Sequence, residues 1–169
     1  TEYFNEASNG RERAFALVTA GPGLTNIVTA IGGAWLESRE LLVVGGQSKV
    51  SDLARGRVRQ IGHQEIDGVG IVRPITVLAV SAVRRLDKYE VLQTTRRSRS
   101  HRKGPVFIEM SLDVSAMPKL EISNRELPVK AKSPQVNEID LKKVVEMYSK
   151  AKRPLILIGG GLDRVDSAH

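Results

Sequence analysis

The sequence contains no cysteine, few aromatic residues and no long apolar run. Without cysteine the chain can form neither a disulfide nor a thiolate metal site, and this composition is compatible with a reducing compartment. No stretch reaches the roughly 18 consecutive apolar residues that a membrane-spanning helix requires. Residues 1–6 lack the basic and apolar segments of a signal peptide. We therefore expect a cytoplasmic protein without a membrane partner.

The scarcity of aromatic residues limits what the core can contain. Aromatic residues make up 4% of the 169 residues, whereas hydrophobic residues make up 41%. The core is therefore expected to consist of valine, isoleucine, leucine and alanine, a composition typical of a buried parallel sheet. The length allows one domain, or one domain and part of another.

The chain is basic, with 26 basic and 19 acidic residues and a formal net charge of +7. Basic surfaces attract phosphate, so a nucleic-acid-binding domain is one hypothesis, which a steep loss of DNA affinity with salt would support. No aromatic residue interleaves with the densest basic patch to stack on bases. We expect this patch to be a solvated helix end and loop, with no nucleic-acid partner. The patch comprises Arg96, Arg97, Arg99, His101, Arg102 and Lys103.

An apolar run over residues 14–18 stops at a short segment with two glycines and a proline, residues 19–23. Apolar residues then return at helical spacing, which predicts a strand, a tight turn and a helix. Gly21 and Gly23 allow backbone angles or close approaches that a side chain would forbid, whereas Pro22 fixes one φ angle. Ligands gather at the carboxyl ends of strands in α/β sheets, so this turn is the first candidate for a site.

Further short apolar runs alternate with helical patterns along the chain. This alternation predicts an α/β fold with a parallel sheet flanked by helices. One predicted helix would carry Glu65 in its first turn, where an acid interacts favourably with the helix dipole. Residues 48–63 contain glycines and alternating arginines, which predict a loop. The further predicted strands are residues 40–47, 75–83 and 104–110, and the further predicted helices are residues 64–72 and 87–99.

A change in composition after the fourth predicted strand indicates a domain boundary. Residues 117–135 contain three prolines, several lysines and little periodicity, which indicates a linker. We predict a first domain over residues 1–116, lacking its first strand. An amphipathic helix, an apolar strand at residues 154–158 and a glycine turn predict the start of a second, Rossmann-like α/β domain over residues 136–169. Both ends of the sequence are abrupt, so we expect a fragment.

Five segments occur in the order and spacing of a known family. They are residues 18–26 (VTAGPGLTN), 43–47 (VVGGQ), 63–67 (HQEID), 73–76 (RPIT) and 104–109 (GPVFIE). The series resembles the amino-terminal, pyrimidine-binding domain of thiamine-diphosphate enzymes of the acetolactate synthase type. The later segment that begins at Val136 resembles the opening of the family's central domain. One glycine turn alone is a weak signal, whereas five ordered segments are specific.

The resemblance implies a mechanism in which thiamine diphosphate carries the chemistry. In this family a glutamate on the first helix promotes formation of the cofactor's ylid, which attacks the carbonyl of a small 2-oxo acid such as pyruvate. Carbon dioxide leaves, and the two-carbon unit passes to a second carbonyl. The family's glutamate would precede Thr1 and its Mg²⁺-binding motif belongs to a later domain. We therefore name no metal ligand and expect this chain to be inactive alone.

The resemblance also assigns residues to the site. Gln64 matches a catalytic glutamine close to cofactor and substrate, and a polar residue at a helix start is its structural alternative. For the glycine turn the alternative is an ordinary capped turn. Two roles stay open for Gln47, that of a pocket-lining residue and that of a polar residue at a strand end. The predicted cofactor-binding residues of the first domain are Gly21, Pro22, Gly23, Asn26 and Gln47.

The last glycine turn matches one that contacts flavin adenine dinucleotide (FAD) in several family members. Two roles stay open for Gly159, Gly160 and Gly161: contact with flavin, and a tight connection without flavin. The chain departs from the family at Val77, where a lysine often stands, and at residues 111–112. These departures weaken the flavin and substrate assignments and leave the fold assignment unchanged.

The function implied by the resemblance is that of a carboligase similar to acetolactate synthase. The full enzyme is expected to be a homo-oligomer, a dimer or a tetramer, because in this family the pyrimidine domain of one subunit faces the diphosphate domain of another. One open alternative is a related sugar-modifying acyloin synthase, decarboxylase or oxidase. The other is a non-catalytic binding or regulatory module with the same fold.

Overall fold

The computed structural model describes residues 14–100, 102–118 and 137–159. The chain divides into two compact units, Thr1–Arg125 and Glu126–His169, and each is described by itself. The predicted linker, residues 117–135, lies almost entirely outside the described residues. The predicted domain boundaries therefore stay a prediction.

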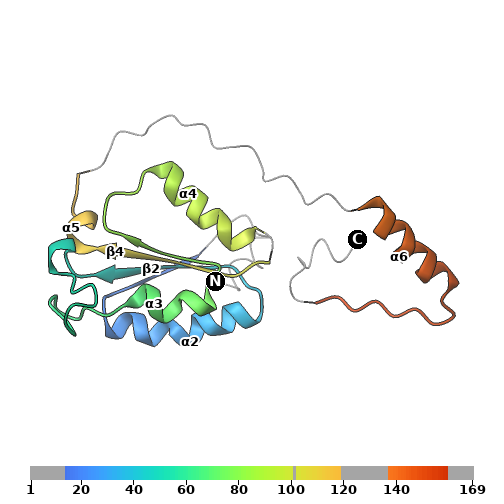
Figure 1. The fold of residues 1–169 in the computed structure, drawn as a ribbon, viewed down its shortest axis with the longest axis horizontal. Helices are drawn as coiled ribbons and strands as arrows, with labels where there is room; N and C mark the ends of the chain where they lie inside the picture. The colour runs from blue at the N-terminus through green and yellow to red at the C-terminus, as the bar shows by residue number, and fades with distance from the viewer. Residues whose placement is uncertain (1–13, 101, 119–136, 160–169) are drawn as a thin grey trace. The chain divides into compact units, whose positions relative to one another are not determined.

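The first unit is built on a four-stranded parallel sheet with the strand order β1-β2-β4-β3 (Figure 1). All three strand pairs are parallel, so the carboxyl ends of the strands meet at one edge of the sheet. The predicted α/β fold is confirmed. The strands are β1 (Phe15–Val18), β2 (Leu41–Gln47), β3 (Leu78–Ala82) and β4 (Pro105–Ser111).

Helices cover both faces of this sheet. Figure 1 shows α2 and α3 on one face and α4 on the other. Short 3-10 turns, η1 to η3, follow β2, α3 and α4. The helices of this unit are α2 (Pro22–Leu36), α3 (Gly68–Val72), α4 (Lys88–Arg96) and α5 (Leu112–Ser115), and the 3-10 turns are η1 (Val50–Asp52), η2 (Arg73–Ile75) and η3 (Arg97–Arg99).

Strand β4 separates two hydrophobic clusters, because successive side chains of a strand point to opposite faces of the sheet. Phe107 packs with buried residues of α2, α3 and β2 on one face. Val106 and Ile108 pack with Ala82 on the other face. The core is aliphatic as predicted, except that Phe107 is its largest fully buried side chain.

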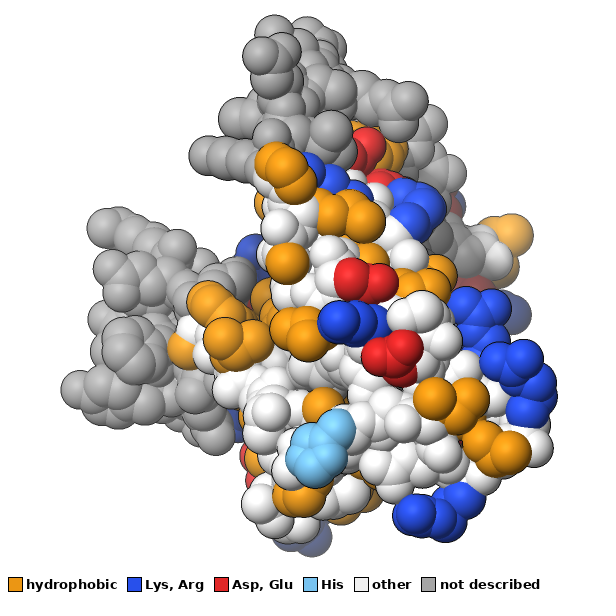
Figure 2. Space-filling view, turned by 90° about the vertical axis from the view of Figure 1, so that its left-hand side faces the viewer, with side chains coloured by type: hydrophobic (Ala, Val, Ile, Leu, Met, Phe, Trp, Pro, Cys, Tyr) orange, Lys and Arg blue, Asp and Glu red, His pale blue; other side chains and the backbone are white. Residues whose placement is uncertain are grey.

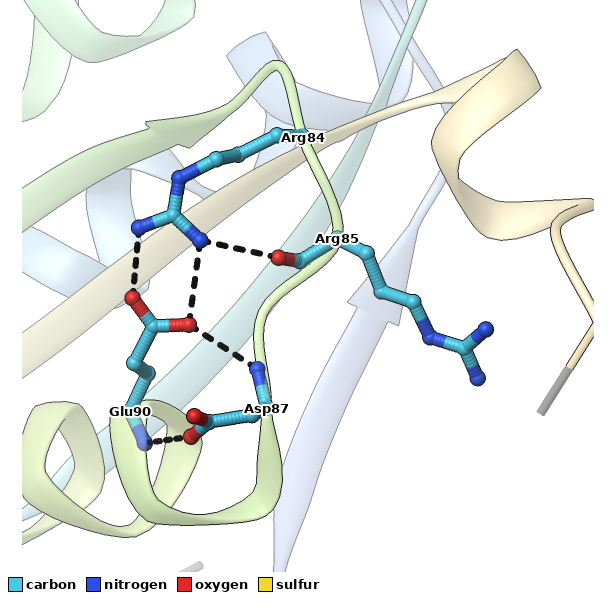
Figure 3. Close-up of polar contacts among 4 residues, drawn as sticks. All are labelled: Arg84, Arg85, Asp87 and Glu90. Atoms are coloured by element: carbon cyan, nitrogen blue, oxygen red, sulfur yellow. Dashed lines mark hydrogen bonds and ion pairs between the residues drawn. The ribbon is translucent and has the colours of Figure 1, made fainter. Parts of the chain in front are cut away.

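The start of α4 is fixed by a reciprocal pair of hydrogen bonds (Figure 3). Glu90 N donates to Asp87 Oδ1 at 2.7 Å, and Asp87 N donates to Glu90 Oε2 at 2.9 Å. Arg84 binds both carboxylate oxygens of Glu90 from the preceding turn. This capping box sets the amino terminus of the helix where the sequence predicted it. The predicted helix over residues 87–99 ends earlier, at Arg96, and continues as η3.

Two sequence predictions around α3 are wrong. The helix predicted over residues 64–72 begins only at Gly68, because Asp67 caps it by accepting from Gly70 N. Glu65 is therefore not an acid of the first turn. The strand predicted over residues 75–83 is shorter, since Pro74 lies in the first turn of η2 and the strand begins after it at Leu78.

The second unit contains helix α6 (Glu138–Lys150), which confirms the predicted amphipathic helix. Asn137 caps it, with its side chain accepting from Ile139 N. The strand predicted over residues 154–158 is not formed. A strand requires a hydrogen-bonded neighbour, and none pairs with this segment among the described residues of the unit. Its apolar side chains are accordingly exposed, with Leu155 at 91%.

Candidate functional site

The turn between β1 and α2 has the geometry that only glycine adopts easily. Gly21 lies at the N-cap of α2 with φ 59° and ψ −112°. A Cβ atom at Gly21 would stand 2.8 Å from the carbonyl oxygen of Gln64. The backbone of Gln64 also has a positive φ, 57°. The loop before α3 therefore lies directly against the glycine turn, which a side chain at residue 21 would prevent.

A cavity of about 610 Å³ opens between this turn and the loop. Figure 2 looks onto the end of the unit where the loop lies, at the left of Figure 1. The structure thus brings together three predicted site residues, Gly21, Pro22 and Gln64, at the carboxyl end of β1. The cavity is lined by Gly21, Pro22, Thr25, Arg59, Gln60, His63, Gln64, Glu65, Ile66 and Asp67.

The other predicted residues of the turn do not line this cavity. Asn26 is exposed on α2. At Gly23 a Cβ atom would stand 2.7 Å from the Cγ2 atom of Thr19, so this glycine permits close packing within the turn. The assignment of Asn26 and Gly23 to cofactor binding stays a prediction.

Gln47, at the carboxyl end of β2, is directed into the protein. It is 6% exposed and does not line the cavity. Its Nε2 donates to the carbonyl oxygen of Ile66 at 2.8 Å and to Glu109 Oε1 at 3.1 Å. Its Oε1 accepts from Ser48 N at 2.8 Å. Every polar atom of this side chain is satisfied by the protein, so the structure places Gln47 where it holds the loop.

Ser48 supplies a second tether to the same loop. Its hydroxyl group donates to the carbonyl oxygen of His63 at 3.1 Å. The two tethers, from Gln47 to Ile66 and from Ser48 to His63, lie on either side of Gln64 along the chain. The loop is therefore fixed before and after the residue predicted to be catalytic.

Glu109, in the middle of β4, is a buried acid that the site prediction missed. It is 6% exposed and accepts from Gln47 Nε2 at 3.1 Å and from the hydroxyl group of Ser81 at 3.0 Å. Burial raises the pKa of Glu109 above its ordinary value, and the hydrogen bonds from Ser81 and Gln47 oppose this rise. A single charge inside an otherwise apolar strand was the available signal.

Glu65 closes the loop that precedes it. Its Oε1 accepts from Ala54 N at 2.5 Å, and its Oε2 accepts from Ile61 N at 2.9 Å and from Gly62 N at 3.0 Å. The Ile61 amide lowers the pKa of Glu65 most; burial opposes this, and the amides of Ala54 and Gly62 add to the lowering. The predicted role in a helix dipole is wrong because the carboxylate is used inside the loop.

A protein family matches the segment that builds this cavity. The family described as "Thiamine pyrophosphate enzyme, N-terminal TPP binding domain" matches residues 3–71, which include the glycine turn, both tethers and Gln64. The chain belongs to the family of thiamine-diphosphate enzymes. The resemblance to members of the acetolactate synthase type is confirmed as well, by similarity to acetolactate synthase large subunits.

Relatives among these enzymes have several names. The chain is 35% identical over 150 residues to the acetolactate synthase large subunit of Lactococcus lactis subsp. lactis (strain IL1403), covering 87% of this chain and 25% of that protein. It is 30% identical over 153 residues to glyoxylate carboligase of Escherichia coli O157:H7, and the match covers 90% of this chain and 25% of that protein. It is 30% identical over 179 residues to 2-hydroxyacyl-CoA lyase 2 of Bos taurus, and the match covers 85% of this chain and 28% of that protein. The chain therefore spans about a quarter of the length of these relatives.

The cavity has the size and the lining to take the flat aminopyrimidine end of thiamine diphosphate. Its volume lies within the range of roughly 300–1,000 Å³ that ligand pockets have. Pro22 and Ile66 supply apolar surface, and the exposed Gln64 supplies an amide that can both donate and accept. Within the described residues, no group of three or more His, Asp or Glu side chains could hold a metal ion.

The predicted flavin-binding glycines lie in the second unit. Among the described residues, no atom lies within 4 Å of the place that a Cβ atom at Gly159 would take. Gly160 and Gly161 lie outside the described residues. Flavin contact at this turn stays a prediction.

Within the basic patch, Arg96 ends α4, Arg97 and Arg99 lie in η3, and Arg102 and Lys103 follow η3. His101 lies outside the described residues. Arg99 pairs with Glu40 at 3.1 Å. Arg102 lies over the ring of Trp35, 4.9 Å from its centroid, and donates to the Trp35 carbonyl oxygen at 2.8 Å. Arg99 and Arg102 are thus engaged by other parts of the protein. In the part of the chain that the structure describes, no helix has the length and apolar character to cross a membrane.

Proposed function

We propose that the protein forms the pyrimidine-binding part of a thiamine-diphosphate-dependent carboligase. The substrate is a small 2-oxo acid, which is decarboxylated, and its remaining carbonyl unit is transferred to a second carbonyl compound. Thiamine diphosphate, when bound, supplies the electron sink for this chemistry. The observation that carries the proposal is the cavity in which the Gly21 turn faces Gln64, on a chain that belongs to this enzyme family.

In this proposal, the residues of this chain bind and orient the cofactor and the substrate. Pro22 forms an apolar wall on one side of the cavity, and the Gln64 amide offers a donor and an acceptor. The tethers from Gln47 and Ser48 fix the loop that carries Gln64. A functional side chain on a fixed loop loses less entropy when it engages a ligand, which favours reaction at a defined geometry.

Several finer statements belong to the same proposal. The relatives named acetolactate synthase, glyoxylate carboligase and 2-hydroxyacyl-CoA lyase have similar identities to this chain, so pyruvate and glyoxylate are the first substrates to assay. We further propose that the whole enzyme uses Mg²⁺ bound outside this chain, assembles as a homo-oligomer and works in the cytoplasm. The chain alone is expected to be inactive.

The test is an assay of the full-length protein with thiamine diphosphate and Mg²⁺. Carbon dioxide release and acyloin formation from pyruvate or glyoxylate are expected, and Gln64→Ala should lower the rate by about 10²-fold. Gln93→Ala, a change on α4 away from the cavity, is the matched control and should leave the rate unchanged. Absence of both thiamine diphosphate binding and product would overturn the proposal and favour the non-catalytic module.

A further inference from the structure

The loop between η1 and α3 presents three arginines at alternate positions, Arg55, Arg57 and Arg59. All three side chains are exposed. The backbone turns sharply at the start of the loop, where Arg55 has φ 50° and Gly56 has φ 77°. Only Arg59 among the three lines the cavity that also contains Gln64. The loop therefore brings one cation to the candidate site and leaves two nearby on the surface.

This loop is held by internal hydrogen bonds. The Glu65 carboxylate binds three of its backbone amides, as described above. Arg57 Nε donates to the carbonyl oxygen of Ala54 at 3.3 Å, and Gln60 Nε2 donates to the carbonyl oxygen of Gly62 at 2.8 Å. A loop closed in this way presents Arg59 from a defined backbone, which reduces the entropy lost when its side chain binds a ligand.

The charges that line the cavity are not equivalent. The carboxylate of Glu65 accepts from three amides of the loop, and that of Asp67 accepts from Gly70 N at the start of α3. Both acids are thus engaged by the backbone. The hydrogen bond of Arg59 is to the neutral Gln60, from Nη1 to Oε1 at 3.1 Å, and within the described residues no carboxylate pairs with its guanidinium group. The cavity consequently has an available cation and no equally available anion.

We infer that Arg59 binds an anionic group, a carboxylate or a phosphate, of the substrate that enters the cavity beside Gln64. The inference rests on the proposed function and assigns Arg59 as the residue that holds the acidic group of its substrate. A guanidinium group matches both anions with two parallel hydrogen bonds. Arg55 and Arg57, on the same loop, add positive potential that draws anions toward the cavity.

The experiment measures anion binding by the 169-residue chain and does not depend on turnover. Pyruvate, its neutral amide pyruvamide and inorganic phosphate are titrated separately at low salt, and amide chemical shifts are followed by NMR. The variants are Arg59→Gln and, as the matched control from the same loop, Arg55→Gln. Arg59→Gln is expected to weaken binding of the preferred anion by about tenfold or more, whereas Arg55→Gln changes it by less than about threefold.

The three probes separate the sources of the anionic group. Tighter binding of pyruvate than of pyruvamide and phosphate identifies a carboxylate, and tighter binding of phosphate identifies a phosphate group. Binding of neither anion by the unaltered chain, or equal losses in the two variants, would overturn the inference. Thiamine is titrated in the same series. Failure of thiamine to bind, with Arg59-dependent anion binding intact, would count against the proposed function alone.

Discussion

Gly21 and Gln64 meet through their backbones, 43 positions apart in the chain, at a distance that excludes even a methyl group. A Cβ atom at Gly21 would stand 2.8 Å from the Gln64 carbonyl oxygen, and both residues have positive φ angles. This contact joins the turn after β1 to the loop before α3 and forms one wall of the cavity. The candidate site therefore depends on the backbone as much as on its side chains.

Gly21→Ala is expected to lower the free energy of unfolding by about 3 kcal/mol, because it combines an unfavourable backbone conformation with a steric clash. Gly32→Ala, within α2, is the control. Among the residues that the structure describes, no atom outside the helix lies within 4 Å of a Cβ atom there. Alanine in a helix is favoured over glycine by about 1 kcal/mol. Urea unfolding measures both. Equal stability of the two variants would contradict a constrained turn.

Gln47→Leu is expected to cost about 3 kcal/mol of stability, because it leaves the Ile66 carbonyl oxygen, the Ser48 amide and Glu109 without a partner. The same change at Gln93 is the control. The Nε2 atom of Gln93 is buried without a partner in the described part of the chain, so its replacement by leucine should be nearly neutral. Denaturant unfolding at neutral pH compares them. A loss of stability in Gln93→Leu, with none in Gln47→Leu, would contradict the assignment of Gln47 as the tether of the loop.

Glu109 should make the fold less stable as the pH rises. Burial raises its pKa in the folded state above the ordinary 4.5, so the folded protein holds the proton longer than the unfolded chain does. The contribution of Glu109 to the free energy of unfolding is fully present below pH 4.5 and is lost as the pH rises through the folded-state pKa. The stability of Glu109→Gln relative to the unaltered protein should therefore increase with pH above about 4.5. Unfolding curves at pH values from 4 to 8 measure this difference. A difference in stability between Glu109→Gln and the unaltered protein that stays constant over this range would contradict the prediction.

Glu65 should have the opposite effect. Its pKa is lowered below the ordinary 4.5 by the loop amides, so stability from this group is present above pH 4.5 and is lost as the pH falls through the folded-state pKa. Glu65→Gln should remove this acid sensitivity. It should also speed hydrogen exchange at Ala54, Ile61 and Gly62, the three amides that the carboxylate binds. Exchange at Val43 in the core is the internal reference. Unchanged exchange at the three amides would show that the carboxylate does not close the loop.

The sequence predicted the sheet well because each strand is a short apolar run that ends at polar residues or glycine. It predicted the turn at Gly21 and the loop with alternating arginines for similar local reasons. The apolar run at residues 154–158 did not form a strand, since pairing needs a neighbour and the run alone does not provide one. The local sequence pattern was therefore sufficient to predict the elements whose structure depends on neighbouring residues in the chain.

The site was harder to predict because its polar contacts join distant parts of the chain. Glu109 binds Gln47 and Ser81, which lie 62 and 28 positions away. Nothing near Gln47 in the sequence distinguishes a pocket-lining amide from one that tethers a loop. Glu65 was assigned to a helix start, whereas the amides that it binds precede it in a loop. Such choices are made by tertiary packing, which a single sequence does not display.

The Glu65 carboxylate closes the arginine loop through main-chain amides, and every amino acid except proline provides such a donor. The closure therefore does not depend on which side chains stand between its anchor points. Substitutions at positions 55, 58 and 59 can alter the charge and shape presented to the cavity while the loop keeps its path. Selectivity for ligands can thus evolve at these positions separately from the stability of the domain.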